Sequence, residues 1–189
     1  VDRFAFPFIK TLGDESAYSR AMANATFGFP AGKPALLEKA VTGVDELLRD
    51  FDEHIGDLGD LYEYMLSKLS TAGTNGQFRT PQHIRDMMVD PKPGELICDP
   101  ACGTAGFLIS AAEHIRVKYE SGMTAEQWDV FTGANGAAPQ FSGFEMDQTM
   151  LRISAMNLML HEVDAPDVRY LDSVSQKNGI SNKFDVILA

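Results

Sequence analysis

The residues with the clearest chemical potential lie in one stretch, residues 95–108, which has the sequence ELICDPACGTAGFL. Its apolar start predicts a short strand, and Pro100 ends that strand because proline lacks the N–H group that a sheet ladder needs. Asp99 is thereby placed at the strand end. Gly103 and Gly106 follow, and glycine allows unusual backbone angles or a close approach of the backbone to a ligand. The stretch therefore predicts a strand, a tight turn and a helix start around a ligand.

The apolar spacing of residues 105–118 predicts the helix that follows, and the first backbone N–H groups of a helix have no partner within it. A dinucleotide-binding turn has the pattern Gly-x-Gly-x-x-Gly, whereas Gly103 and Gly106 give only Gly-x-x-Gly. The carboxylate of Asp99 would repel a phosphate here and suits a cationic ligand. S-adenosylmethionine, which carries a sulfonium and an ammonium group and no phosphate, meets that requirement.

Residues 99–108, DPACGTAGFL, resemble the cofactor-binding motif of the DNA methyltransferases that methylate amino groups. They are most similar to the motif in the modification subunits of type I restriction–modification systems, although the motif alone also fits a turn of some other α/β protein. Upstream, residues 76–81, GQFRTP, resemble the segment of these subunits that reaches over the methionine end of the cofactor. Thr80 as N-cap, with Pro81 behind it, also predicts a helix to about Val89.

Three acids are predicted at the carboxyl ends of three parallel strands. Asp99 ends the first strand, Glu145 ends a second, and Asp172 follows a third. A dense apolar run at residues 184–189 predicts a fourth strand, suited to the centre of a parallel sheet. Because ligands of open parallel sheets lie beyond the carboxyl ends of the strands, we expect the three acids to face one site.

The connections between these strands complete the predicted sheet. The second strand covers residues 141–145 and the third residues 167–171, with a mostly apolar helix at residues 148–161 between them, capped by Asp147. Residues 121–140 are predicted to form a loop or insertion. This insertion explains why the second acid follows the first by much more than the usual roughly 20 residues of nucleotide-binding folds.

The resemblance and the strand ends together predict how a cofactor is held. Glu145 is placed to accept hydrogen bonds from ribose hydroxyls, Met146 to pack on the adenine face, and Asp172 to accept from the adenine amino group. The resemblance implies that S-adenosyl-L-methionine is bound by the following residues: Phe78, Thr80, Pro81, Asp99, Pro100, Ala101, Gly103, Thr104, Gly106, Phe107, Glu145, Met146, Asp172 and Ser173.

The first third of the chain is predicted to be helical. Apolar positions at helical spacing mark helices at residues 34–52 and 57–69. Throughout residues 1–70 we expect the aromatic and methionine side chains in the core; a surface for a partner subunit is the alternative. A polar, glycine-rich linker then separates residues 1–72, a helical subdomain, from residues 73–189, the cofactor-binding part of a methyltransferase domain. The expected fold class is α/β, with a Rossmann-like parallel sheet truncated after its fourth strand.

Charge and composition limit the partners. The formal net charge is −11 and no cluster of Lys and Arg occurs, so phosphate contacts with DNA would come from later segments or other subunits. Cys98 and Cys102 lack partners at metal-binding spacing, so we expect reduced, packed thiols and no metal site. No run approaches the roughly 18 apolar residues of a membrane helix, and no signal peptide precedes the first helix, so a cytoplasmic protein without membrane contact is expected.

The resemblance implies an adenine-N6 DNA methyltransferase, the modification subunit of a type I system, with specificity and restriction subunits and double-stranded DNA as partners. In that family the fourth strand leads into Asn-Pro-Pro and an aromatic residue, which hold the target adenine. The sequence stops at Ala189, before this motif, so no catalytic residue is assigned. The 189 residues are expected to bind cofactor without methylating DNA.

Three alternatives stay open at this stage. An S-adenosylmethionine-dependent methyltransferase acting on a protein or a small molecule is favoured by the acidic charge. A nicotinamide-dependent oxidoreductase is disfavoured by the missing middle glycine and by Asp99 at the phosphate position. A helical partner module without enzymatic activity is disfavoured by the acids at the strand ends.

Overall fold

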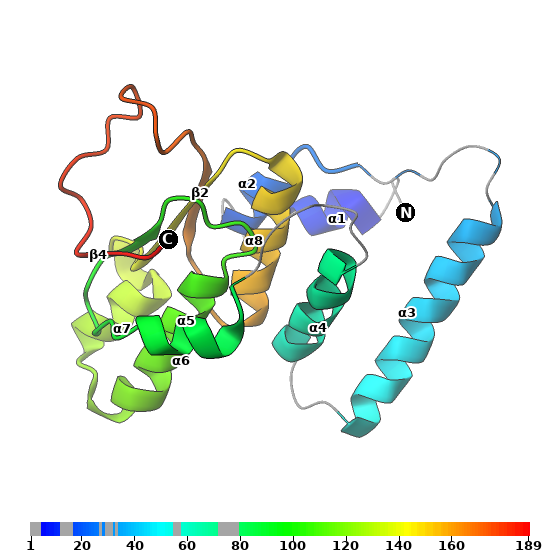
Figure 1. Cartoon of the computed structure of the whole chain (residues 1–189), viewed down its shortest axis with the longest axis horizontal. Helices are drawn as coiled ribbons and strands as arrows, with labels where there is room; N and C mark the ends of the chain where they lie inside the picture. The colour runs from blue at the N-terminus through cyan, green and yellow to red at the C-terminus, as the bar shows by residue number, and fades with distance from the viewer. Residues whose placement is uncertain are drawn as a thin grey trace.

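A computed structural model of the chain describes residues 5–11, 17–26, 28, 32, 34–54, 58–71 and 80–189. At its centre the described residues form a parallel four-stranded sheet in the order β3-β2-β1-β4 (Figure 1). The strands are β1 Ile97–Asp99, β2 Phe141–Glu145, β3 Asp167–Tyr170 and β4 Val186–Ile187. The predicted α/β class with a parallel sheet is confirmed.

The strand β1 lies between β2 and β4 and is therefore completely buried. Ile97 pairs in parallel with Phe141 of β2 on one side and with Val186 of β4 on the other. All three residues of β1 are buried, as expected for an apolar strand that packs on both faces. This register brings Asp99 level with Gly143, two residues before the end of β2.

Two helices cover the same face of the sheet. The helix α6, Gly106–Tyr119, packs on β1 and β2, and α8, Gln148–Leu160, packs on β2 and β3. Both connections step along the sheet in the same direction, and right-handed crossovers then place both helices on one side. Asp147 caps α8 as predicted, since its Oδ1 accepts hydrogen bonds from the N–H groups of Thr149 and Met150 at 2.7 and 2.9 Å.

The prediction of a loop at residues 121–140 is wrong. The structure has a helix there, α7, Ala125–Thr132, between two short 3₁₀ turns, Glu120–Gly122 and Ala134–Gly136. A reciprocal capping box between Thr124 and Gln127 starts α7. The buried ring of Phe131 then anchors it edge-on against Phe141 of the sheet.

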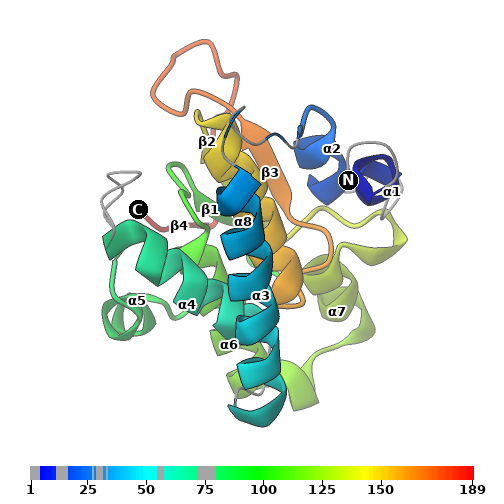
Figure 2. The ribbon, with the colours of Figure 1, turned by 90° about the vertical axis from the view of Figure 1, so that its right-hand side faces the viewer.

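The chain before the sheet forms five helices within the described residues: α1 Ala5–Thr11, α2 Ala17–Met22, α3 Pro34–His54, α4 Leu58–Thr71 and α5 Gln82–Met88. Both predicted long helices are confirmed. The helices α2 and α4 pack on α8, and α5 packs on α6. The helix α3 stands outermost in Figure 1 and nearest the viewer in Figure 2. The expected domain boundary after residue 72 lies outside the described residues.

Burial of the early helices differs from expectation. The aromatic rings of Phe8 and Tyr64 are exposed, so the prediction of a core position is wrong for both. The first half of α3 exposes four aliphatic side chains: Leu36, Leu37, Val41 and Val44. Met159 is exposed as well, although its helix α8 is mostly apolar. Helical periodicity marks an apolar stripe, but it does not say whether another element covers that stripe.

Several predicted boundaries shift by a few residues. Pro81, not Thr80, is the N-cap of α5, because the Pro81 carbonyl accepts the first helical hydrogen bonds and no side chain caps them. Ala105 becomes the N-cap of α6 instead of its first residue. The strand β4 is shorter than the predicted residues 184–189. Just before it, the Asp185 side chain accepts from the backbone N–H of Leu96 at 2.8 Å.

Candidate functional site

Asp99 provides a buried carboxylate at the carboxyl end of the central strand. Its side chain is 3% exposed, and its Oδ1 accepts a hydrogen bond from the backbone N–H of Ala101 at 3.0 Å. The pKa of Asp99 is raised from its ordinary value of 3.8 to about 6, chiefly by burial. The Ala101 hydrogen bond acts to lower this pKa and the nearby Glu145 acts to raise it, and the value of about 6 includes both effects. An acid in this environment favours a cation beside it.

Glu145, at the end of the neighbouring strand β2, is held by backbone donors. Its Oε1 accepts from the N–H groups of Met146 and Asp147 at 2.8 and 2.9 Å, and its Oε2 accepts from Gly103 at 3.1 Å. An ionised carboxylate has about four acceptor positions. These contacts therefore leave Oε2 able to accept one more hydrogen bond, and they tie β2 to the glycine turn.

The turn between β1 and α6, residues 100–105, has two residues with left-handed backbone angles. Gly103 has φ 51°, and Ala105 has φ 66° although it carries a Cβ atom. A left-handed conformation costs a non-glycine residue on the order of 1–2 kcal/mol. The turn is held by hydrogen bonds from Cys102 N–H to the Phe144 carbonyl at 3.0 Å and from Ala105 N–H to the Cys102 carbonyl at 2.6 Å.

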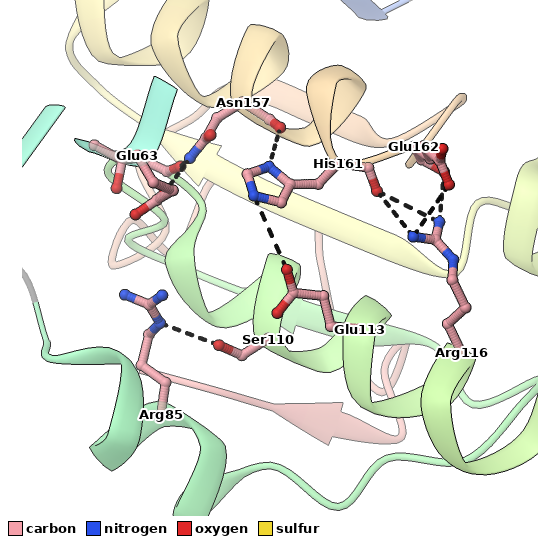
Figure 3. Close-up of polar contacts among 9 residues, drawn as sticks. Glu63, Arg85, Ser110, Glu113, Arg116, Asn157, His161 and Glu162 are labelled. Carbon is pink, nitrogen blue, oxygen red and sulfur yellow. Dashed lines mark hydrogen bonds and ion pairs between the residues drawn. The ribbon is translucent and has the colours of Figure 1, made fainter. Parts of the chain in front are cut away.

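Gly106 is needed for a close approach and not for an unusual backbone angle. A Cβ atom on Gly106 would lie 2.9 Å from Nη1 of Arg85 on α5. The buried Arg85 guanidinium donates to the Thr80 carbonyl at 2.9 Å and to Oγ of Ser110 at 3.1 Å (Figure 3). Arg85 therefore holds the Thr-Pro segment against the start of α6.

A pocket of about 180 Å³ opens over this turn. Seven of the predicted site residues line it: Thr80, Asp99, Ala101, Gly103, Thr104, Gly106 and Phe107. Arg85, Cys102 and Ala189 line it without having been predicted. The sequence signal for Arg85 was weak, because a single arginine one turn after Pro81 is common on helix surfaces, and only its burial reveals its contact with the turn.

The other predicted residues lie outside this lining. Pro81 and Pro100 flank the pocket in sequence but do not line it. Met146, next to Glu145, is half exposed. Asp172 and Ser173 follow β3, and Oδ1 of Asp172 accepts a hydrogen bond from the N–H of Val174 at 3.1 Å. The chain past β3 stays near the site edge, since the N–H of Leu171 donates to the Glu145 carbonyl at 3.3 Å. Phe78 lies outside the described residues.

The two cysteines beside the turn are unsuited to nucleophilic or metal chemistry. Cys98 and Cys102 are free and buried, as predicted. Burial raises the pKa of the Cys98 thiol to about 12 and raises that of Cys102 as well, so both thiols are neutral near pH 7. In the part of the chain that the structure describes, no group of His, Cys, Asp and Glu could hold a metal ion, and no helix could cross a membrane.

A parallel sheet with acids at adjacent strand ends and a pocket over a glycine turn is typical of Rossmann-like α/β proteins, whose ligands lie at this edge of the sheet. The chain belongs to the N-6 DNA Methylase family, whose model matches residues 53–189. The family match begins just before α4 and includes the whole sheet.

The relatives of this chain include methylase and modification subunits of type I restriction enzymes. The chain is 33% identical to the EcoEI type I restriction enzyme methylase subunit of Escherichia coli over 138 residues, which is 69% of this chain and 26% of that protein. It superposes with a TM-score of 0.62 on a crystallised modification subunit assigned to a type I restriction enzyme of Vibrio vulnificus YJ016, at 28% identity, covering 89% of this chain and 35% of the other. The chain thus spans about a quarter of the curated relative's length.

A second solved structure has a similar extent of overlap. It comes from work on complex assembly and conformational transition of the type I restriction–modification system. The TM-score is 0.61 at 26% identity, with 96% of this chain and 37% of that chain covered. The predicted resemblance to type I modification subunits is confirmed.

Proposed function

We propose that the protein is the cofactor-binding part of a type I modification subunit that transfers a methyl group from S-adenosylmethionine to N6 of adenine in DNA. The observation that carries this proposal is the buried carboxylate of Asp99 in the pocket over the glycine turn, in a chain of the N-6 DNA Methylase family. The alternative nicotinamide cofactor would bring a pyrophosphate to this turn, next to Asp99 and Glu145.

The chemistry of the pocket fits the charge pattern of S-adenosylmethionine. Asp99 lines the pocket together with residues 101–104 of the turn. The volume of about 180 Å³ is below the roughly 300–1,000 Å³ usual for a whole ligand. We infer that the pocket holds the methionine end, while the adenosine end extends along the edge towards Glu145 and Asp172.

Each proposed contact has a geometric basis in the chain. The unused acceptor position on Oε2 of Glu145 suits a ribose hydroxyl. The half-exposed side chain of Met146 presents an apolar surface for the adenine ring, and Asp172 with Ser173 follows the neighbouring strand. Thr80 and Pro81, held by Arg85, together with Phe78, would cover the methionine end.

The proposed role of these residues is to bind and orient. The bound cofactor would supply an electrophilic methyl on its sulfonium, and the adenine amine would be the nucleophile. Positioning two reactants in this way converts a bimolecular encounter into an effectively unimolecular step. Asp99, by pairing with a cationic group, fixes the cofactor in the pocket and excludes phosphate ligands.

The partners belong to the same proposal. One similar structure comes from work on complex assembly of the type I system, which supports association of the whole protein with other subunits of such a system. We propose that these are specificity and restriction subunits and that the assembled complex binds double-stranded DNA. The net charge of −11 means that most phosphate contacts would come from other segments or subunits. The same charge favours a second candidate, methylation of a protein or a small molecule.

Titration calorimetry tests the cofactor. S-adenosylmethionine should bind the 189-residue chain and NAD should not. Asp99→Asn keeps an acceptor for the Ala101 N–H but removes the charge, so it should weaken binding at least about tenfold. Asp167→Asn is the matched control and should bind normally. Asp167 is paired with Arg169 and lies at the amino end of β3, whereas Asp99 lies at the carboxyl end of β1.

Two outcomes would contradict the assignment. Binding of NAD in place of S-adenosylmethionine would overturn the cofactor class, and equal affinity of Asp99→Asn and the unaltered protein would remove Asp99 from the site. The substrate is tested separately: the full-length protein with its partner subunits should methylate adenine in duplex DNA, and methylation of protein alone would favour the second candidate.

A further inference from the structure

A buried amide on α8 connects the turn of residues 100–105, called the cofactor turn below, with helix α4. Figure 3 shows this amide, Asn157, beside Glu63 of α4. Asn157 is completely buried. Its Nδ2 donates one hydrogen bond to the Thr104 carbonyl of the turn at 2.8 Å and a second to Oε1 of Glu63 on α4 at 2.7 Å. One NH₂ group thus joins three elements that are far apart in the sequence.

The orientation of the Asn157 amide is determined by its neighbours. The Thr104 carbonyl and the Glu63 carboxylate only accept hydrogen bonds, so the amide must turn its NH₂ group towards both. Its Oδ1 is left buried without a partner among the described residues. A buried acceptor without a partner is costly, which indicates that the two donated bonds dominate the placement of this side chain.

The peptide group that Asn157 holds is the one between Thr104 and the left-handed residue Ala105. The carbonyl of Thr104 accepts from Asn157, and the N–H of Ala105 in the same peptide donates to the Cys102 carbonyl at 2.6 Å. Both polar groups of this peptide are therefore occupied. Ala105 has φ 66° and needs such restraint, since an alanine released from it would favour negative φ.

The other end of the connection lies on a helix that is closely packed against α8. Gly59 of α4 faces the His161 ring so closely that a Cβ atom there would lie 2.9 Å from the ring. The Nδ1 of His161 is 2.9 Å from the Asn157 carbonyl, so this ring is fixed to the same turn of α8. Glu63 is thereby presented to Asn157 by a helix that lies close to α8 at Gly59.

We propose that Glu63 and Asn157 are positioning residues for the cofactor turn, through which docking of α4 sets the affinity for the cofactor. The proposal rests on the proposed function of the turn. Glu63 orients the Asn157 amide, and the amide orients the Thr104–Ala105 peptide. That peptide in turn fixes residues 101–104, which line the pocket. The N-terminal helices are then part of the binding site without touching the ligand.

The test uses the whole chain and two readouts. Glu63→Ala removes the acceptor, and Glu63→Gln restores a neutral one of the same length. Arg152→Ala is the matched control: Arg152 joins α8 to α2 through the Ala21 carbonyl at 3.2 Å, without contact to the turn. Hydrogen exchange of the Ala105 amide reports the turn without any ligand, and calorimetry with S-adenosylmethionine reports affinity.

Glu63→Ala should speed exchange of the Ala105 amide about fivefold to tenfold and weaken S-adenosylmethionine binding by a similar factor, because one charge-assisted hydrogen bond is lost. Glu63→Gln should recover both to within about twofold, and Arg152→Ala should change neither. Unchanged exchange at Ala105 in Glu63→Ala, or an equal effect of Arg152→Ala, would overturn the proposal. If the unaltered protein bound no S-adenosylmethionine while Glu63→Ala still sped exchange, the proposed cofactor would fail and the link between α4 and the turn would stand.

Discussion

The turn between β1 and α6, residues 100–105, and the long helix α3 are stabilised in different ways. In the turn, backbone N–H and C=O groups are paired with partners from β2 and α8, and the side chains around them are mostly buried. The helix α3 satisfies its backbone internally, as every helix does, and exposes aliphatic side chains to solvent. The turn depends on distant residues, whereas α3 depends chiefly on its own sequence.

This difference predicts where substitutions matter. A change in the turn or its partners should disturb several elements at once, because its hydrogen bonds cross between them. A change on α3 should be absorbed locally, because among the described elements none packs extensively against it. Five substitutions test this contrast, beginning with the one that should have the largest effect.

Asn157→Asp should be the most damaging. It places a carboxylate where both neighbours, the Thr104 carbonyl and the Glu63 carboxylate, accept hydrogen bonds. An uncompensated buried charge costs on the order of 3–5 kcal/mol of unfolding free energy. Urea denaturation at pH 7 measures it, with Asn182→Asp on the exposed loop as the control. A loss below about 1 kcal/mol would mean that the turn tolerates rearrangement as readily as a surface loop.

The charge of Asp99 should make both stability and binding depend on pH. The folded-state pKa of about 6 exceeds the ordinary 3.8, so between these values the folded protein binds more protons than the unfolded chain. Stability contributed at this site is therefore lost as pH rises from about 4 to 6. Asp99→Asn removes the loss and should stabilise the protein at pH 7 by on the order of 1–3 kcal/mol, with no gain at pH 3.5.

Binding should follow the opposite direction. If the ionised Asp99 is the form that binds a cation, affinity for S-adenosylmethionine should fall about tenfold between pH 7 and pH 5, since the pKa is about 6. Calorimetry at the two pH values measures this, and Asp99→Asn should show no such change. A pH-independent affinity in the unaltered protein would separate the buried acid from the cofactor.

Two glycine-to-alanine substitutions compare the regions directly. In Gly106→Ala the new methyl would lie 2.9 Å from Nη1 of Arg85, so the guanidinium must move and its bonds to Thr80 and Ser110 weaken. We expect a loss of about 1–3 kcal/mol. Gly43→Ala on α3 meets no atom within 4 Å and should stabilise by roughly 0.5–1 kcal/mol through helix propensity. Thermal or urea unfolding gives both values, and equal signs would contradict the contrast.

The sequence was informative where structure is local and less so where it depends on distant partners. Both long N-terminal helices follow from helical periodicity and the strands from short apolar runs. The motif residues from Asp99 to Phe107 largely do line one pocket. Glu63 and Asn157 were not assigned a role, because they are 94 residues apart and each resembles an ordinary helix residue. The turn glycines were predicted to allow unusual φ or a close approach, and Gly103 and Gly106 do so respectively, but the left-handed φ of Ala105 was not expected from the sequence.

The smallest expected effect is on α3. Val41→Asp alters an exposed side chain, and surface substitutions usually change stability within about 0.5 kcal/mol. The helix should therefore tolerate a charge that the turn could not. Urea denaturation at two protein concentrations, tenfold apart, measures the effect. A loss above about 2 kcal/mol that grows with concentration would show that a second copy of the chain covers the aliphatic face of α3; a loss of that size at both concentrations would show that the face packs within the chain, and the contrast with the turn would fail.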